Sequence, residues 1–413
     1  MTELTAPSPF VSKLAQLAAS DGFWRLIDAY TPRVFGLLFH SYLLVSFGAA
    51  QYAFPGWVLG SFGLLLAALP DPHSYILVRA NGARAHRLSA LCVPAVLAKL
   101  ALAGAIALVC VVVFASDKMT TVFDGTWIWV ALASILYGGT EFLWAVLGTV
   151  SLSTGQVRRV AIWGLLARGL SVGALVSLWH IGGGTLATYL SLAALPVIGA
   201  WAYLSPKSWR LRRAWRFFSK AVRTYAGWVQ GISLITVGLF QLPTLALGMW
   251  SGSDAALVGF VAFGSRLLQA GFQPFQILQS VVIRDASAAH RAGLSHARSF
   301  LWTLFKTGGA GFAIVTALAL IVAFAQGIIA QNSLVLGVAM SLGIALSIWF
   351  RYELAQTLAT RAARSIFLYG YAPVFVLAVV ATPACLALFG VNGLAIVVFL
   401  GWAGLSNSWR WIA

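Results

Sequence analysis

A stripe of polar side chains in an apolar stretch is the part of the sequence best suited to hold a ligand. Arg266, Gln269, Gln273, Gln276 and Ser280 recur at intervals of three or four residues, so on a helix they share one face. Amides donate and accept hydrogen bonds, which suits sugar hydroxyls, and a guanidinium offers a planar fork to a phosphate. The stripe predicts a polar cavity wall for an anionic, sugar-bearing ligand. The alternative is that these side chains hold neighbouring helices together.

A second group of polar residues follows similar spacing. Gln230, Ser233, Gln241 and Thr244 lie on one face of the apolar stretch 226–249. We expect Gln230 and Gln241 to line the same cavity.

Several further ionisable residues fall within or at the edges of apolar stretches, where each costs about 2.5 to 3.5 kcal/mol and is a functional candidate by default. Three cations are predicted to reach the cavity, namely Lys99, Arg168 and Arg351. Three acids, Asp71, Glu141 and Glu353, are predicted either to neutralise cations or to carry H⁺ or Na⁺ for coupling. Glu141 with Arg168 and Arg351 with Glu353 are the candidate ion pairs.

The elements that position these residues must be membrane-spanning helices. Apolar residues make up 60% of the 413 residues, charged residues only 9%, and the mean hydropathy is +0.89, far from the composition of a soluble domain. A spanning helix needs about 20 mostly apolar residues. About twelve such stretches are present: 31–48, 53–78, 90–115, 127–149, 160–180, 185–204, 226–249, 255–282, 300–326, 333–356, 366–389 and 391–408. The connections between them are short, so function is expected among the helices.

The distribution of positive charge predicts orientation. Most of the 27 Lys and Arg residues fall in segments that would be cytoplasmic if the N-terminus is cytoplasmic, which follows the positive-inside rule. Both termini are therefore expected in the cytoplasm, with the chain in the bacterial inner membrane. The densest basic run lies at 207–223, where Leu211, Trp215, Phe218 and Val222 form an apolar stripe. This segment predicts an amphipathic helix on an anionic membrane surface rather than a nucleic-acid site.

The two halves of the chain are weakly similar to each other. Gly56 and Gly259 lie 203 residues apart, and Leu64–Ala67 aligns with Leu267–Ala270 at the same offset. Repeats with an even number of spans share one orientation and enclose a central path. We expect an all-α polytopic protein with two six-helix lobes: residues 1–22 form a cytoplasmic segment, 23–204 the N-lobe, 205–224 the linker helix, and 225–413 the C-lobe.

Two segments resemble the MOP superfamily of transporters, in particular its flippases for polysaccharides and lipid-linked oligosaccharides. Leu44–Ala53 resembles that family's glycine, short polar link and tyrosine between the first two helices, and Val258–Leu267 is similar to the start of its eighth helix. The resemblance implies two lobes that alternate between facing inward and outward. It also implies that the cargo is a polyprenyl-diphosphate-linked sugar chain, with glycosyltransferases and a polymerase of the same pathway as further partners.

Three other classes of protein fit parts of this pattern. A cation-coupled antiporter of the MATE type shares the layout but should present acids to its cargo, and cations are in excess here. A membrane-bound transferase lacks support because the six His residues are scattered and no metal, cofactor or nucleophile motif is present. The three Cys residues match neither a metal site nor a disulfide framework. A non-transporting scaffold of a polysaccharide assembly complex remains an alternative, and no cofactor is expected.

Overall fold

The computed structural model describes residues 21–68, 82–115, 126–154, 157–180, 211–221, 227–250, 254–291, 300–360 and 363–408. Throughout these ranges the regular structure is helical. The helices are α2 (Asp21–Ala68), α4 (Gly82–Phe114), α6 (Trp127–Thr154), α7 (Val157–His180), α9 (Leu211–Ala221), α10 (Gly227–Met249), α11 (Ala255–Arg291), α12 (Phe300–Ala325), α13 (Gln331–Thr360), α14 (Ala363–Ser365), a π-helical turn (Ile366–Tyr371) and α15 (Ala372–Ser408). The expected span 185–204 lies outside the described residues.

Helix α2 is a hairpin of two spans. In a straight helix His40 and Tyr52 would be about 18 Å apart, yet the Tyr52 hydroxyl lies 3.0 Å from Nδ1 of His40. The reversal occurs at Gly48, whose φ of 80° is one that glycine adopts without steric cost. A polar link between spans was expected through residue 52, but Gln51 and Tyr52 already belong to the returning helix because one glycine suffices for the turn.

Helix α15 reverses in the same way. Gly390 has a φ of 58°, and a Cβ on Gly393 would meet the carbonyl group of Cys385, eight residues earlier. Eight residues of straight helix would separate these groups by about 12 Å. The predicted boundary between spans 366–389 and 391–408 is therefore confirmed.

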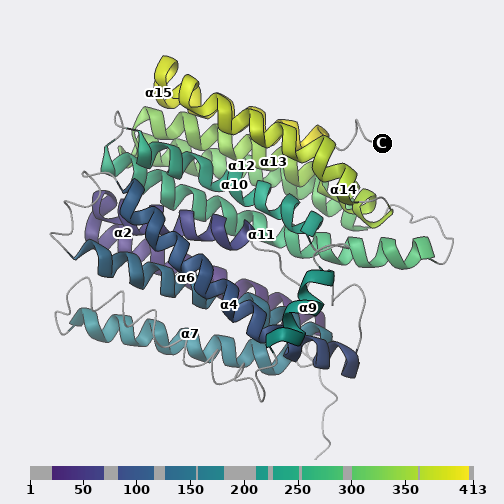
Figure 1. The fold of residues 1–413 in the computed structure, drawn as a ribbon. Helices are drawn as coiled ribbons and strands as arrows, with labels where there is room; N and C mark the ends of the chain where they lie inside the picture. Colours follow the sequence, from purple (N-terminus) through teal and green to yellow (C-terminus); the bar gives the residue numbers. More distant parts are fainter. Residues whose placement is uncertain are drawn as a thin grey trace, which may run out of the picture.

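The helices form two groups that lie side by side (Figure 1). Helices α2, α4, α6 and α7 make up the first group, and α10 to α15 make up the second, with α2 packed against α10 and α11. Within the described ranges, seven helices are long and apolar enough to cross a membrane, judged by length and composition. The grouping agrees with the expected division into an N-lobe and a C-lobe.

The lobes meet through small residues. A Cβ on Gly259 of α11 would overlap the carbonyl oxygen of Ala49 in α2, and a Cβ on Gly56 would lie 2.8 Å from that of Ala262. Such contacts let two helix backbones approach closely, as small residues commonly do between membrane helices. The contact joins α2 just after its turn to the first turns of α11.

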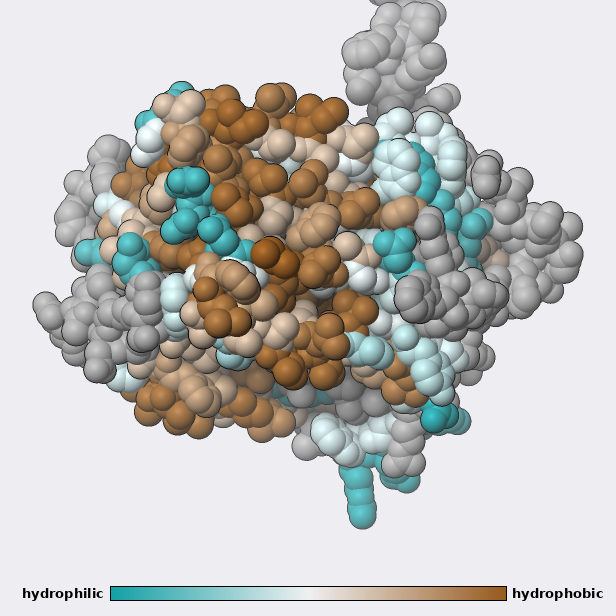
Figure 2. Space-filling view, turned by 90° about the horizontal axis from the view of Figure 1, so that it is seen from above, coloured by the Kyte–Doolittle hydropathy of each residue, from teal (hydrophilic) through white to brown (hydrophobic). Residues whose placement is uncertain are grey.

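The outer surface of the protein is apolar. Hydrophobic residues cover much of the coloured face in Figure 2, with hydrophilic patches left of centre and toward the right-hand end. On α12 a run of large apolar side chains is exposed, comprising Ile314, Val315, Leu318, Ile321 and Val322. An exposed apolar surface of this kind suits lipid rather than water.

Candidate functional site

Arg266 lies where the two lobes meet. Its Nη2 atom is buried, and no hydrogen-bond acceptor for it is present among the described residues. The guanidinium is close enough to His40, Tyr52 and Tyr137 of the N-lobe to interact electrostatically with each. A positive charge of the C-lobe is therefore held against a polar cluster of the N-lobe.

The N-lobe side of this site is built by the α2 hairpin and α6. The rings of His40 and Tyr52 make an edge contact with centroids 5.8 Å apart, and His40 makes a similar contact with Tyr137 at 6.0 Å. Tyr52 also meets Phe263 of α11 edge-on at 6.4 Å. His40 and Tyr137 were missed by sequence reasoning. The signal that could have found His40 is Gly48, since a reversal there brings residues on either side together.

The polar stripe of α11 continues the face that contacts the N-lobe. Gly259 and Ala262, which touch α2, stand in the same alternating spacing as Arg266, Gln269, Gln273 and Gln276. The three glutamines are half-buried, and none forms a side-chain hydrogen bond with another described residue. Amides that held helices together would be hydrogen-bonded. Within the described ranges, therefore, no side-chain hydrogen bond ties these amides to a neighbouring helix.

Arg351 lies deeper in the C-lobe, on the other side of α11. Its Nε donates to Oε1 of Gln279 at 2.6 Å, and its guanidinium carbon lies 4.4 Å from the ring centroid of Phe272. Gln279 was not singled out from the sequence, because it falls outside the spacing of the stripe. Arg351 and Arg266 are thus separate sites on two faces of α11.

Glu141 and Arg168 form the ion pair expected from the sequence. Oε2 of Glu141 lies 3.4 Å from Nη2 of Arg168, and only 4% of the Arg168 side chain is exposed. The guanidinium also stacks on Trp144 at 5.2 Å. The pair joins α6 to α7 within the N-lobe, so the structure gives Arg168 a charge partner inside its own lobe.

The predicted pair of Arg351 with Glu353 is wrong. Glu353 instead accepts a bond from the Trp302 indole at 3.1 Å and pairs with Lys306 at 2.9 Å. Residues two apart on a helix point about 200° away from each other, so they cannot meet. Lys306 also donates to the carbonyl oxygen of Trp349 at 2.7 Å, which fixes it between α12 and α13.

The remaining predicted residues fall at helix contacts or outside the described chain. Gln230 donates to the carbonyl oxygen of Ala67 at 2.8 Å, which ties α10 to α2 across the lobe boundary. Gln241 is buried, and a Cβ on Gly60 would lie 2.9 Å from its Oε1 atom. Lys99 is buried on α4. Asp71 lies outside the described residues.

Metal ligands do not gather anywhere in the described ranges, where no three His, Cys, Asp or Glu side chains lie together. Cys110 and Cys385 are free and partly buried. The polar chemistry of the site therefore rests on one guanidinium, one imidazole, two phenols and a row of amides.

Comparisons with known proteins place the chain by its fold. No family model matches it, and no curated protein matches its sequence. Among solved structures it is similar to the eukaryotic MATE transporter AtDTX14, with a TM-score of 0.56 and 12% identity over 98% of this chain and 96% of that one. It is also similar to a point mutant of the MATE transporter VcmN from Vibrio cholerae, with a TM-score of 0.51 and 13% identity over 97% and 96%. The chain is a multi-pass membrane protein with the all-helical, two-lobe fold of twelve helices that these neighbours share.

Proposed function

We propose that the chain is an alternating-access membrane transporter whose cargo carries a negatively charged group, and that this cargo is a polyprenyl-diphosphate-linked oligosaccharide. The observation that carries the proposal is Arg266, whose buried Nη2 atom has no acceptor among the described residues. It stands at one end of a row of half-buried amides on the face of α11 that looks toward the N-lobe.

Arg266 differs from Arg168 and Lys306 in its lack of a carboxylate partner among the described residues. Removing a guanidinium from water without a partner costs several kcal/mol. Arg168 and Lys306 are compensated by carboxylates at 3.4 and 2.9 Å, whereas Arg266 faces neutral phenols and an imidazole. A diphosphate that docks on Arg266 would supply the missing charge, and Gln269, Gln273 and Gln276 would meet the sugar hydroxyls.

The fold supports a rocking motion between the lobes. Near Gly259 the lobes are in backbone contact, and the face beyond Arg266 carries amides with no protein partner among the described residues. In this account the described conformation is closed beside the α2 turn, and transport separates Gly259 from Ala49 while the opposite end closes. The lipid tail stays in the bilayer while the charged head follows the polar face.

A second candidate, a MATE-type cation-coupled antiporter, is favoured by the fold because both neighbours described above are MATE transporters. The ion pairs formed by the glutamates of the spans argue against this candidate. Among spanning residues whose side chains are described, Glu141 and Glu353 are both paired with cations, Glu353 through Oε1 alone, since its buried Oε2 atom has no hydrogen-bond partner there. A site for an organic cation needs a carboxylate that is free to bind it.

Transport in proteoliposomes separates the two candidates. The probe is a short-chain polyprenyl-diphosphate disaccharide carrying a fluorophore that dithionite bleaches only in the outer leaflet. We expect wild-type protein to expose the inner-leaflet probe, Arg266→Gln to abolish the exposure, and Arg266→Lys to retain part of it. Arg159→Gln, at an exposed position of α7, is the matched control and should behave as wild type.

The same vesicles test the antiporter with ethidium under an imposed H⁺ or Na⁺ gradient. Gradient-driven ethidium uptake without movement of the diphosphate probe would overturn the proposal in favour of the second candidate. If neither probe moves, the transport proposal is wrong and the scaffold alternative gains support.

A further inference from the structure

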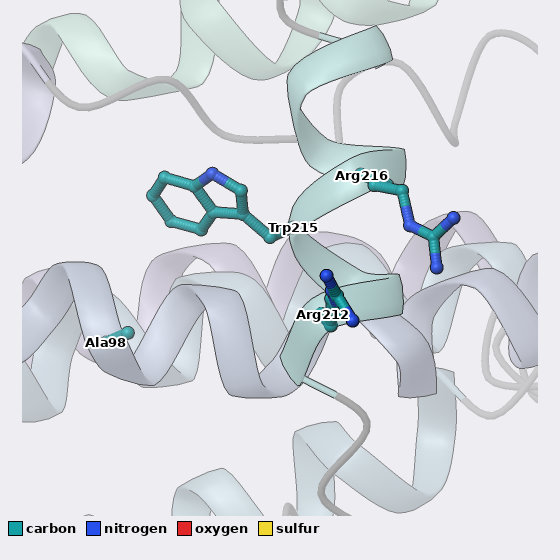
Figure 3. Close-up of a pocket in the computed structure, with 4 residues that line it drawn as sticks. All are labelled: Ala98, Arg212, Trp215 and Arg216. Carbon is teal, nitrogen blue, oxygen red and sulfur yellow. The ribbon is translucent and has the colours of Figure 1, made fainter.

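Helix α9 and the helix beneath it form a pocket that the transport site does not include. Figure 3 shows α9 crossing α4 steeply, with Trp215 extending over α4 on the side of Ala98, Arg216 on the other side of α9, and Arg212 between them; these four residues line the pocket. The pocket is open to the surroundings and has a volume of about 920 Å³. Ala214 is fully buried and seats α9 on α4. The pocket is therefore set by packing between two helices.

The walls of the pocket combine opposite chemistries. Arg212 and Arg216 are one helical turn apart on α9, so their guanidinium groups can act together on one anionic group. The Trp215 side chain is 51% exposed and extends along α4 on the other side of the space (Figure 3). A ligand that fits both walls has an anionic phosphate joined to an apolar body.

The position of the pocket beside an apolar helix points to the bilayer rather than to the bulk solvent. Ala98 of α4 lies within the apolar stretch 90–115 that the sequence predicts as a membrane span. Indole rings concentrate at the headgroup level, where a membrane meets water, and Trp215 supplies one beside this span.

We propose that this pocket binds the headgroup of an anionic glycerophospholipid, with Arg212 and Arg216 on the phosphate and with Trp215 and Ala98 along the glycerol and the first acyl carbons. Five residues separate the end of α9 from the start of α10, which is the first span of the C-lobe. A bound lipid would brace the segment that joins the lobes. The proposal stands independently of the cargo, because none of its residues belongs to the α11 stripe.

Binding of short-chain lipids to the full-length protein in detergent tests the site. Dioctanoyl phosphatidylglycerol, dioctanoyl phosphatidylcholine and inorganic phosphate are titrated against wild type, Arg212→Gln with Arg216→Gln, and Arg213→Gln with Lys220→Gln. Both double variants remove two positive charges from exposed positions of α9, but only the first pair lines the pocket. Circular dichroism checks that each variant retains its helices.

We expect wild type and the Arg213/Lys220 variant to prefer phosphatidylglycerol over phosphatidylcholine by about tenfold or more, and the Arg212/Arg216 variant to lose that preference. Equal loss in both double variants would overturn the proposal, because diffuse surface charge would then explain binding. Full retention in the Arg212/Arg216 variant, or no preference in wild type, would also overturn it. Inorganic phosphate that binds as tightly as the lipid would assign the pocket to a water-soluble anion instead.

Discussion

Replacing Gly259 with alanine should weaken the contact between the lobes. The new methyl carbon would overlap the carbonyl oxygen of Ala49 and lie 2.7 Å from its carbonyl carbon. Carbon atoms pack at about 3.5 to 4.0 Å, so α11 and α2 would have to separate by on the order of 1 Å. Both groups belong to helix backbone and cannot turn aside.

The energetic effect can be estimated and isolated. Forcing an extra methyl into a packed site costs about 1 to 3 kcal/mol, which corresponds to about a 5- to 150-fold shift between two conformations. Gly264→Ala is the matched control, since a Cβ there meets nothing within 4 Å. Both substitutions gain up to about 1 kcal/mol of helix propensity. The difference between them therefore reports the lobe contact alone.

Spin labels at the ends of two helices near the α2 turn measure the outcome. The native cysteines are first replaced, and spin labels are then attached at Thr126, before α6, and at Asp254, before α11. Double electron–electron resonance measures the distance between the two labels, which reports the separation of the lobes. We expect Gly259→Ala to increase the longer-distance population and Gly264→Ala to leave the distribution as in wild type. If the two variants give the same distribution, the backbone contact does not control the conformation and the reasoning fails.

Three further substitutions test individual contacts. Glu141→Gln should lower the free energy of unfolding in detergent by about 2 to 3 kcal/mol, because Arg168 loses its carboxylate partner. Adding Arg168→Gln to this variant should recover most of the lost stability. No recovery would refute the pairing. Tyr52→Phe removes the hydrogen bond between the Tyr52 hydroxyl and His40, which is 3.0 Å long and buried. Denaturant titration should therefore show a loss of about 1 to 2 kcal/mol in the free energy of unfolding. An unchanged midpoint would contradict this bond. Gln273→Leu should slow the dithionite-detected lipid exchange while changing unfolding by less than about 0.5 kcal/mol; a larger destabilisation would mean that this amide holds helices together.

Hydropathy and repeat patterns were sufficient to predict the helical class and the two lobes, because lipid demands long apolar helices whatever their partners are. The turn at Gly390 was also predictable, since it interrupts two apolar stretches. The turn at Gly48 was placed too late. In the sequence, polar residues such as Gln51 predict a loop between two spans. In the structure Gly48 alone makes the turn, so Gln51 already belongs to the second helix.

The site was predictable only where helix periodicity carries the information. Arg266 and the α11 glutamines share a face by spacing alone, and their neighbours Gly259 and Ala262 show that this face meets the other lobe. The partners of Glu353 were not predictable, because Lys306 and Trp302 come from another helix. Contacts between helices depend on packing that no local pattern encodes.

Transport as proposed requires that the α11 face with Gln269, Gln273 and Gln276 is accessible to water and lies in the positive potential of Arg266. Gln273→Cys in a background without native cysteines tests it, through the rates at which anionic and cationic methanethiosulfonate reagents modify the thiol. We predict that the thiol reacts with both reagents. The ratio of the anionic to the cationic reaction rate should be higher for this thiol than for a free thiol in solution, and Arg266→Gln should return the ratio to the free-thiol value. A thiol that reacts with neither reagent, or an advantage for the cationic reagent, would contradict the account.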